Sequence, residues 1–103
     1  EDAVAAYEEA LKLDPGNGEA VLGVARSYRA ARQWGKAIEA YERLPDVDPR
    51  REAESLLGVA WTYCLSRDLY PARFYAGLAA QAGASMGKLR AALADDCKTA
   101  RND

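Results

Sequence analysis

Three arginines on one predicted helix are the side chains best able to bind a charged ligand. Arg26, Arg29 and Arg32 recur every three residues, so successive members lie about one helical turn apart. Residues 26–36 add Lys36 and contain no acid. A guanidinium group binds a carboxylate through two parallel hydrogen bonds, so this run predicts a surface that holds acidic groups of a partner. The alternative interpretation is a solvated basic helix face.

Side chains suited to catalysis or metal binding are scarce. The chain has no histidine to act as a general base, and it has no glycine-rich phosphate loop or P-loop spacing. The pairs Glu8–Glu9 and Asp95–Asp96 are adjacent in sequence, and neighbours on a helix point about 100° apart, so neither pair forms a catalytic dyad. We therefore predict no catalytic residue, no metal site and no cofactor, and we expect that the chain is not an enzyme.

Two cysteines, Cys64 and Cys97, do not make a disulfide framework. A zinc site built on them would need two carboxylates, an uncommon set. A disulfide needs a Cα separation of roughly 4.4 to 6.8 Å, whereas packed helices lie about 8 to 10 Å apart between their axes. We expect free thiols in a reduced compartment, with a disulfide as the alternative.

Composition places the chain among globular proteins. It has 103 residues, of which half are apolar and 29% are charged, which is enough for one domain with a modest core. A net charge of -2 argues against nucleic acid as a ligand. No apolar run approaches the roughly 18 residues of a membrane span, and no secretory signal opens the chain. A cytoplasmic location is favoured, although an upstream signal or anchor is left open. Ten arginines against four lysines, with many alanines, suggest a GC-rich bacterial source.

An internal repeat dominates the sequence. Residues 22–28 (LGVARSY) return at 57–63 (LGVAWTY), a spacing of 35 with five of seven positions identical. Residues 3–15 (AVAAYEEALKLDP) return at 37–49 (AIEAYERLPDVDP), a spacing of 34. Two interleaved echoes at nearly one period predict a repeat of two elements, as in solenoids. Because Glu1 falls inside a repeat, we expect the chain to be a piece of a longer protein.

Helical periodicity runs through the whole sequence, and no strand pattern occurs. Asn17 and Ser85 are expected N-caps, and Asp48 is expected to cap a helix that begins at a proline. Pro45 is expected to end its helix one turn early, and Gly83 to end the fifth helix. The predicted helices span about residues 2–13, 18–32, 35–44, 50–66, 70–82 and 85–101.

The repeat resembles the tetratricopeptide repeat, a helix-turn-helix unit of 34 residues. In that family the first helix carries a large residue, a small one and an aromatic, and the second carries small residues around an aromatic, then a proline. The matching positions are Val24, Ala25, Tyr28 and Val59, Ala60, Tyr63 for first helices, with Ala3, Tyr7, Ala10, Pro15, then Ala37, Tyr41, Pro49, then Ala72, Ala76, Ala79 for second helices.

This resemblance implies an all-α fold, a right-handed solenoid of helical hairpins forming one domain over residues 1–103. Residues 1–15 correspond to the second helix of a truncated repeat, 18–49 and 50–83 to full repeats, and 84–103 to a capping helix. Leu44 stands where the family has a small residue, and the last unit lacks the family's aromatic. Two larger departures are Pro45 with an extra residue before the fourth helix, which makes the middle junction irregular, and the pair Phe74 and Tyr75, which we expect to pack under the sixth helix.

The resemblance also implies a concave groove lined by first helices, which would hold an extended peptide or an amphipathic helix of another protein. Trp61 stands where the preceding repeat has Arg26, and a tryptophan beside arginines is the composition of a binding hot spot. The partner is therefore expected to combine acidic groups with an apolar anchor. The predicted groove residues are Glu19, Leu22, Arg26, Arg29, Leu57, Trp61, Cys64 and Leu65.

Three functions follow from these observations. The leading prediction is a protein-protein interaction scaffold. The first alternative is a module that forms homo-oligomers through exposed solenoid ends, because the first helix has an uncovered side. The second alternative is a regulatory segment of a larger enzyme whose catalytic domain lies outside this chain.

Overall fold

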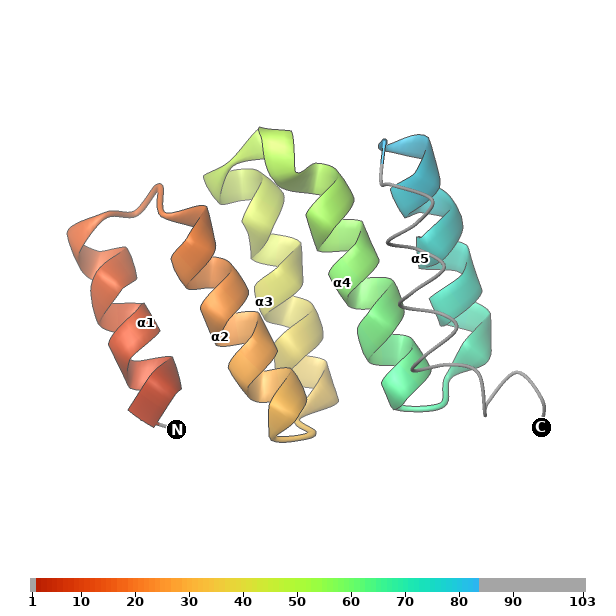
Figure 1. Cartoon of the computed structure of the whole chain (residues 1–103), viewed down its shortest axis with the longest axis horizontal. Helices are drawn as coiled ribbons and strands as arrows, with labels where there is room; N and C mark the ends of the chain where they lie inside the picture. Colours follow the sequence, from red (N-terminus) through yellow and green to blue (C-terminus); the bar gives the residue numbers. More distant parts are fainter. Residues whose placement is uncertain (1, 84–103) are drawn as a thin grey trace.

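A computed structural model of the chain describes residues 2–83, which form five α-helices and one 3₁₀-helix (Figure 1). No strand occurs within this described range, and the all-α prediction is confirmed. The predicted sixth helix, with its cap Ser85, lies outside the described residues. The elements are α1 (Asp2–Leu13), α2 (Gly18–Ala30), α3 (Trp34–Val47), η1 (Pro49–Arg51), α4 (Glu52–Leu65) and α5 (Leu69–Gln81).

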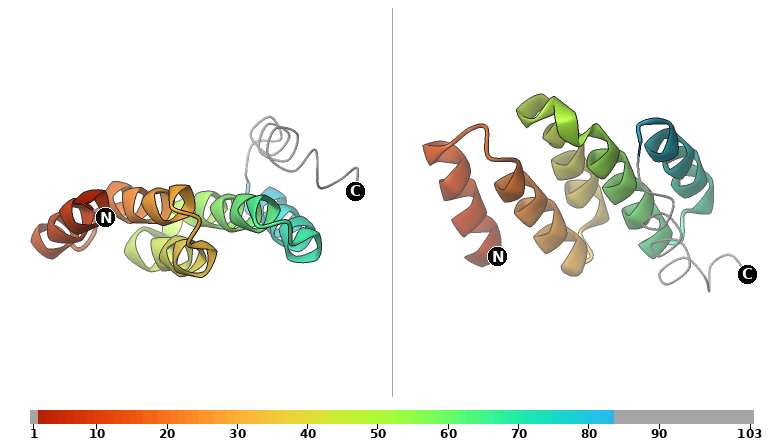
Figure 2. Two further views of the ribbon diagram at one scale, coloured as in Figure 1. Left: turned by 90° about the horizontal axis from the view of Figure 1, so that it is seen from below. Right: turned by 45° about the horizontal axis from the view of Figure 1, so that its top comes forward.

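Each helix packs against the helices before and after it in the chain. Figure 1 shows successive helices running in opposite directions, so that α2 with α3 and α4 with α5 form hairpins. In Figure 2 α3 lies behind a row that contains α2 and α4, which gives the molecule two layers. The first helices of the two hairpins therefore share one face, as expected of stacked helical repeats.

Three helix boundaries lie where capping residues predict them. The Asn17 side chain accepts a hydrogen bond from Ala20 N at 3.1 Å before α2, and the Asp48 side chain accepts one from Arg50 N at 3.1 Å before η1. The 3₁₀-helix η1 then begins at a proline. Proline suits this position because the first N–H of a helix has no partner within the helix, so its absence costs nothing. Gly83 follows α5 with a φ of 101°, a left-handed conformation that glycine adopts without a steric cost.

The turns after α2 and α4 are built in the same way although neither contains glycine. Arg32 and Arg67, which are equivalent in the repeat, have φ values of 61° and 66°. In each turn the next residue donates its N–H to a tyrosine carbonyl five positions back, at 2.9 Å to Tyr28 and 2.8 Å to Tyr63. This bond closes the helix end, and it holds a non-glycine residue in the left-handed region.

The prediction that Pro45 ends its helix is wrong, because α3 continues to Val47. A proline inside a helix has no N–H to donate to the carbonyl four residues earlier, which here belongs to Tyr41. The Ser55 hydroxyl of α4 donates to that carbonyl instead, at 2.7 Å, and Ser55 is only 3% exposed. A hydrogen bond from the next helix therefore satisfies the group that the proline leaves open.

Glycine allows neighbouring repeats to approach closely. A Cβ atom added to Gly23 or to Gly58 would collide with the ring of Tyr7 or Tyr41, respectively. Each tyrosine comes from the second helix of one hairpin unit and lies against the first helix of the next. The glycine of the repeated Leu-Gly-Val-Ala sequence thus leaves room for the tyrosine ring of the preceding unit.

The α-helical positions that match the repeat lie in or beside the core in the two full repeats and are more exposed in α1. On α1 Leu11 is buried, whereas the matching positions Ala3 and Tyr7 are exposed, Tyr7 by 38%. Burial of the repeated alanines lets the helices pack closely. The buried apolar side chains are Leu11, Ala20, Val21, Leu22, Val24, Ala25, Ala37, Ala40, Tyr41, Leu44, Val59, Ala60, Cys64, Ala72, Ala76 and Ala79.

Candidate functional site

The face shared by α2 and α4 brings together two of the predicted groove residues. The Arg29 guanidinium group of α2 lies 4.2 Å from the ring centroid of Trp61 on α4. Its Nη1 also donates a hydrogen bond to the Tyr41 hydroxyl at 2.9 Å. Cation–π and hydrogen-bonding contacts together hold this guanidinium in one place, so less freedom is lost when it binds a ligand.

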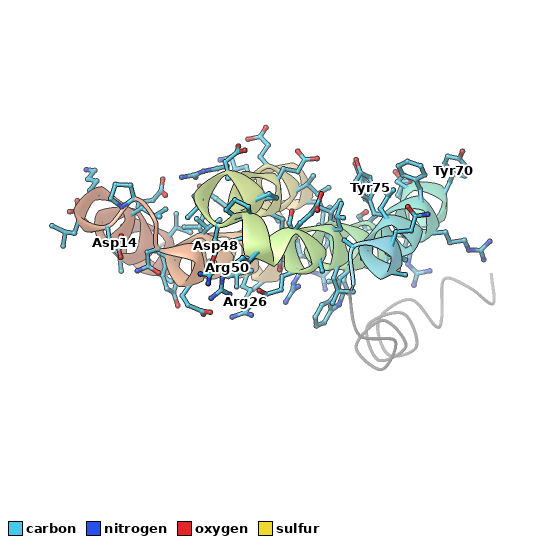
Figure 3. All side chains as sticks on the ribbon, turned by 90° about the horizontal axis from the view of Figure 1, so that it is seen from above. Asp14, Arg26, Asp48, Arg50, Tyr70 and Tyr75 are labelled. Atoms are coloured by element: carbon cyan, nitrogen blue, oxygen red, sulfur yellow. The ribbon has the colours of Figure 1, made fainter. Side chains whose placement is uncertain are left out.

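Trp61 is held by packing and by Arg29. The indole is half-buried, and its Nε1 has no hydrogen-bond partner in the described part of the chain. We name Arg26, Arg29, Tyr41 and Trp61 the basic-aromatic site. Figure 3 shows Arg26 on the side of the molecule opposite Tyr70 and Tyr75.

Arg26 is the open member of the basic-aromatic site. Its side chain is exposed, and it has no hydrogen bond or ion pair within residues 2–83. Burial raises the pKa of the Tyr41 hydroxyl, and the charges of Arg29 and Arg26 partly offset that rise. Both guanidinium groups therefore act on the same hydroxyl, and Arg26 has all its N–H donors available for a ligand.

A second set of charges ties the same helices together at their other end. Arg51 of η1 lies 3.1 Å from Glu19 of α2, 3.1 Å from Glu54 of α4 and 3.3 Å from Asp48. The Arg51 side chain is 27% exposed, whereas the Glu19 side chain is 68% exposed. One arginine thereby links successive first helices, which fixes the width of the face at that end.

The Asp48 carboxylate both caps η1 and pairs with an arginine. It lies 3.1 Å from Nε of Arg50. The hydrogen bond from the Arg50 side chain lowers the pKa of Asp48, against a smaller opposing effect of desolvation. The same bond raises the pKa of Arg50. The junction between the repeats is therefore stabilised by an ionised aspartate.

A family model described as tetratricopeptide repeat matches residues 1–60, which include α1, α2, α3 and the first part of α4. The chain belongs to the tetratricopeptide repeat family. Members of this family generally mediate protein-protein interactions and are typically non-enzymatic scaffolds. Searches of curated proteins and of solved structures found no match to the chain.

Two residues predicted for the groove of this tetratricopeptide repeat are core residues instead. Leu22 is 3% exposed and belongs to the main apolar cluster, and Cys64 is 2% exposed beside Ala72. A ligand on the α2–α4 face does not reach either side chain. Cys64 is disulfide-bonded, so the expected free thiol is wrong at this position, and Cys97 lies outside the described residues.

Of the remaining predicted groove residues, two are half-buried and the third is exposed but forms an ion pair. Leu57 is half-buried against the cluster of Ala60 and the α5 alanines, and Leu65 is half-buried at the end of α4. Glu19 is exposed but engaged with Arg51. Unlike Arg26, none of the three is both exposed and without an ion pair within residues 2–83.

Two residues that support the α2–α4 face of the tetratricopeptide repeat from neighbouring elements were not predicted from the sequence. Tyr41 was matched to the aromatic position of a second helix, and it is buried, but that match does not show that its hydroxyl reaches Arg29. Arg51 was passed over, although its spacing of three residues from Glu54 on a helix is a signal for an ion pair.

Two further properties bear on ligands. Within residues 2–83 no group of three or more His, Cys, Asp or Glu residues could hold a metal ion. No described helix has the length and apolar character needed to cross a membrane.

Proposed function

We propose that this chain is an interaction module whose α2–α4 face binds a peptide or helix of a partner protein through acidic and apolar groups. The observation that supports this most strongly is the Arg29 guanidinium, placed 4.2 Å over the Trp61 ring while Tyr41 accepts its hydrogen bond. A half-buried tryptophan next to a fixed and an open arginine is the composition of an interface hot spot.

The chemistry of the ligand follows from the unused donors. Arg26 and the outer edge of Arg29 present N–H groups to a carboxylate, which accepts two of them at once. The Trp61 ring offers apolar area beside them, which suits an aliphatic or aromatic side chain next to the acid. An acidic peptide with one apolar anchor satisfies both parts of the site.

Affinity capture from a lysate of the source organism tests this proposal. Wild type is compared with the triple variant Arg26→Ala, Arg29→Ala, Trp61→Ala, and thermal melting of both confirms that they are folded. The matched control, Arg43→Ala with Arg73→Ala, removes two exposed positive charges from α3 and α5. A partner retained by wild type and by the control but lost by the triple variant supports the α2–α4 face; equal retention by all three contradicts it.

The salt dependence of the captured complex is a second check on its chemistry. Raising the salt concentration from about 0.01 M to about 1 M shortens the screening length from about 30 Å to about 3 Å. A complex held by exposed Arg26 is expected to weaken strongly over this range. Binding that is unchanged by salt would exclude the acidic part of the ligand.

A second candidate function is self-assembly through α1. Leu13 is 87% exposed and Tyr7 is 38% exposed, so this helix presents apolar side chains to solvent. Sedimentation velocity over a range of protein concentrations tests this function. An average mass that rises with concentration in the wild type, but stays that of a monomer in Leu13→Ser, would favour self-assembly.

A further inference from the structure

Four aromatic residues gather on α4 and α5, away from the basic-aromatic site. We name Tyr63, Tyr70, Phe74 and Tyr75 the aromatic patch. Tyr70 is 83% exposed and Phe74 is 56% exposed. Figure 3 shows Tyr70 and Tyr75 on the side of the molecule opposite Arg26. Exposed aromatics clustered in this way indicate an interaction surface, whereas single exposed apolar residues are ordinary.

Three rings of the aromatic patch contact one another. Tyr63 and Tyr75 are stacked, with centroids 5.7 Å apart and planes 21° apart. Phe74 meets Tyr75 edge-on, with centroids 5.4 Å apart and planes at 87°. Tyr70 precedes Phe74 by four residues on α5, which places both on one side of the helix. Tyr63, Tyr75 and Phe74 thus form one cluster of contacting rings, with the exposed Tyr70 on the Phe74 side of α5.

Negative charge borders the aromatic patch. Asp68 donates its backbone N–H to the Tyr63 carbonyl at 2.8 Å, so the two residues are neighbours at the end of α4. Burial raises the pKa of Tyr63, and Tyr75, Glu42 and Asp68 add to that rise. Glu42 and Asp68 have no ion-pair partner among residues 2–83. The basic residue of α5, Arg73, points about 100° from Phe74 around the helix.

We propose that the aromatic patch, with Glu42 and Asp68, docks a segment of a partner protein that carries lysine or arginine side chains. The faces of aromatic rings carry partial negative charge and attract cations, and the two carboxylates add to this attraction. An acidic segment would meet repulsion from both carboxylates. This second surface prefers the opposite charge to the α2–α4 face, and it stands independently of the function proposed for that face.

The first experiment maps binding with defined probes on the whole chain. Isotope-labelled protein is titrated with a hexa-arginine, a hexa-lysine or a hexa-glutamate peptide while NMR follows the aromatic and backbone signals. The proposal expects the basic peptides to shift the signals of Tyr70, Phe74 and Tyr75, and the acidic peptide to leave them unchanged. Basic peptides that shift only signals outside the patch, or none, would overturn it.

Variants separate the patch from general attraction to acidic surfaces. Replacing both exposed rings (Tyr70→Ser, Phe74→Ser) should weaken the binding of hexa-arginine about tenfold, whereas Leu13→Ser on α1 should leave it unchanged. Glu42→Gln with Asp68→Asn should also weaken it. Equal binding by the ring variant and the Leu13 variant would overturn the proposal. So would concentration-dependent self-association that the ring variant abolishes, because it would make a second copy the occupant.

Discussion

Replacement of Ser55 by alanine should destabilise the fold because of the proline at position 45. The Ser55 hydroxyl donates to the Tyr41 carbonyl at 2.7 Å, and Pro45 has no N–H with which to replace it. Ser55→Ala therefore leaves a buried carbonyl without a donor, which costs about 1 to 3 kcal/mol. This is a sizeable part of the roughly 5 to 15 kcal/mol by which domains are stable.

The same substitution should cost less once position 45 can donate. In a Pro45→Ala background the alanine N–H bonds to the Tyr41 carbonyl along the helix, so that loss of the serine hydroxyl leaves no group unpaired. We expect the cost of Ser55→Ala to fall to less than about 1 kcal/mol in that background, which is a coupling of about 1 kcal/mol or more between the two positions.

Urea unfolding of the four proteins in this cycle, followed by helical circular dichroism, measures the coupling directly. Ser66→Ala is the matched control: Ser66 donates to the Tyr63 carbonyl at 2.9 Å, and no proline is involved. Its cost should be the same in both backgrounds. If Ser55→Ala cost the same free energy of unfolding with and without Pro45, the account of how α3 accommodates its proline would be refuted.

Three other substitutions test further parts of the structure. Gly58→Ala should cost about 1 to 3 kcal/mol in urea unfolding because the new Cβ collides with the Tyr41 ring, whereas Gly35→Ala, with nothing within 4 Å of the added Cβ, should be neutral or stabilising by up to about 1 kcal/mol; equal effects would contradict the close approach. Arg32→Gly should raise the melting temperature, corresponding to about 1 kcal/mol, because glycine adopts the φ of 61° without strain, and a lower melting temperature would count against this. The pKa of Asp48 is lower in the folded chain than its unfolded value of about 4. The ionised carboxylate therefore stabilises the fold fully at a pH above the unfolded pKa, and this stabilisation is lost as the pH falls through the folded pKa. Asp48→Asn should accordingly flatten the loss of melting temperature between neutral and acidic pH, and an unchanged pH profile would show that the Arg50 contact contributes nothing.

The sequence allowed prediction of the features that local chemistry or repetition determines. Asn17, Asp48 and Gly83 mark helix ends because their side chains or backbone conformations act within a few residues. The spacing of 35 residues also put Arg29 and Trp61 on the first helices of successive repeats, and the structure joins them across that face.

Features that depend on a distant group could not be predicted in this way. Inside α3, Pro45 leaves the Tyr41 carbonyl without its helical donor, and Ser55, ten residues later and on another helix, supplies one. Leu22 and Cys64 were assigned to the groove from their positions on first helices. A position on the helix does not show what packs over the side chain, and both residues are buried. The aromatic patch could not be predicted because Phe74 and Tyr75 were expected to pack under the sixth helix. That helix lies outside the described residues, and Phe74 is 56% exposed.

Site-specific photo-cross-linking tests directly whether a partner protein lies on the α2–α4 face. A photoreactive amino acid at Ala30, an exposed position next to Arg29, is compared with one at Glu9, an exposed position on α1. We predict a cross-linked partner from position 30 and none from position 9. The cross-linked product from position 30 should be lost when Arg26 and Arg29 are both replaced by alanine. A partner cross-linked from position 9 alone, or from position 30 regardless of the arginines, would contradict this prediction.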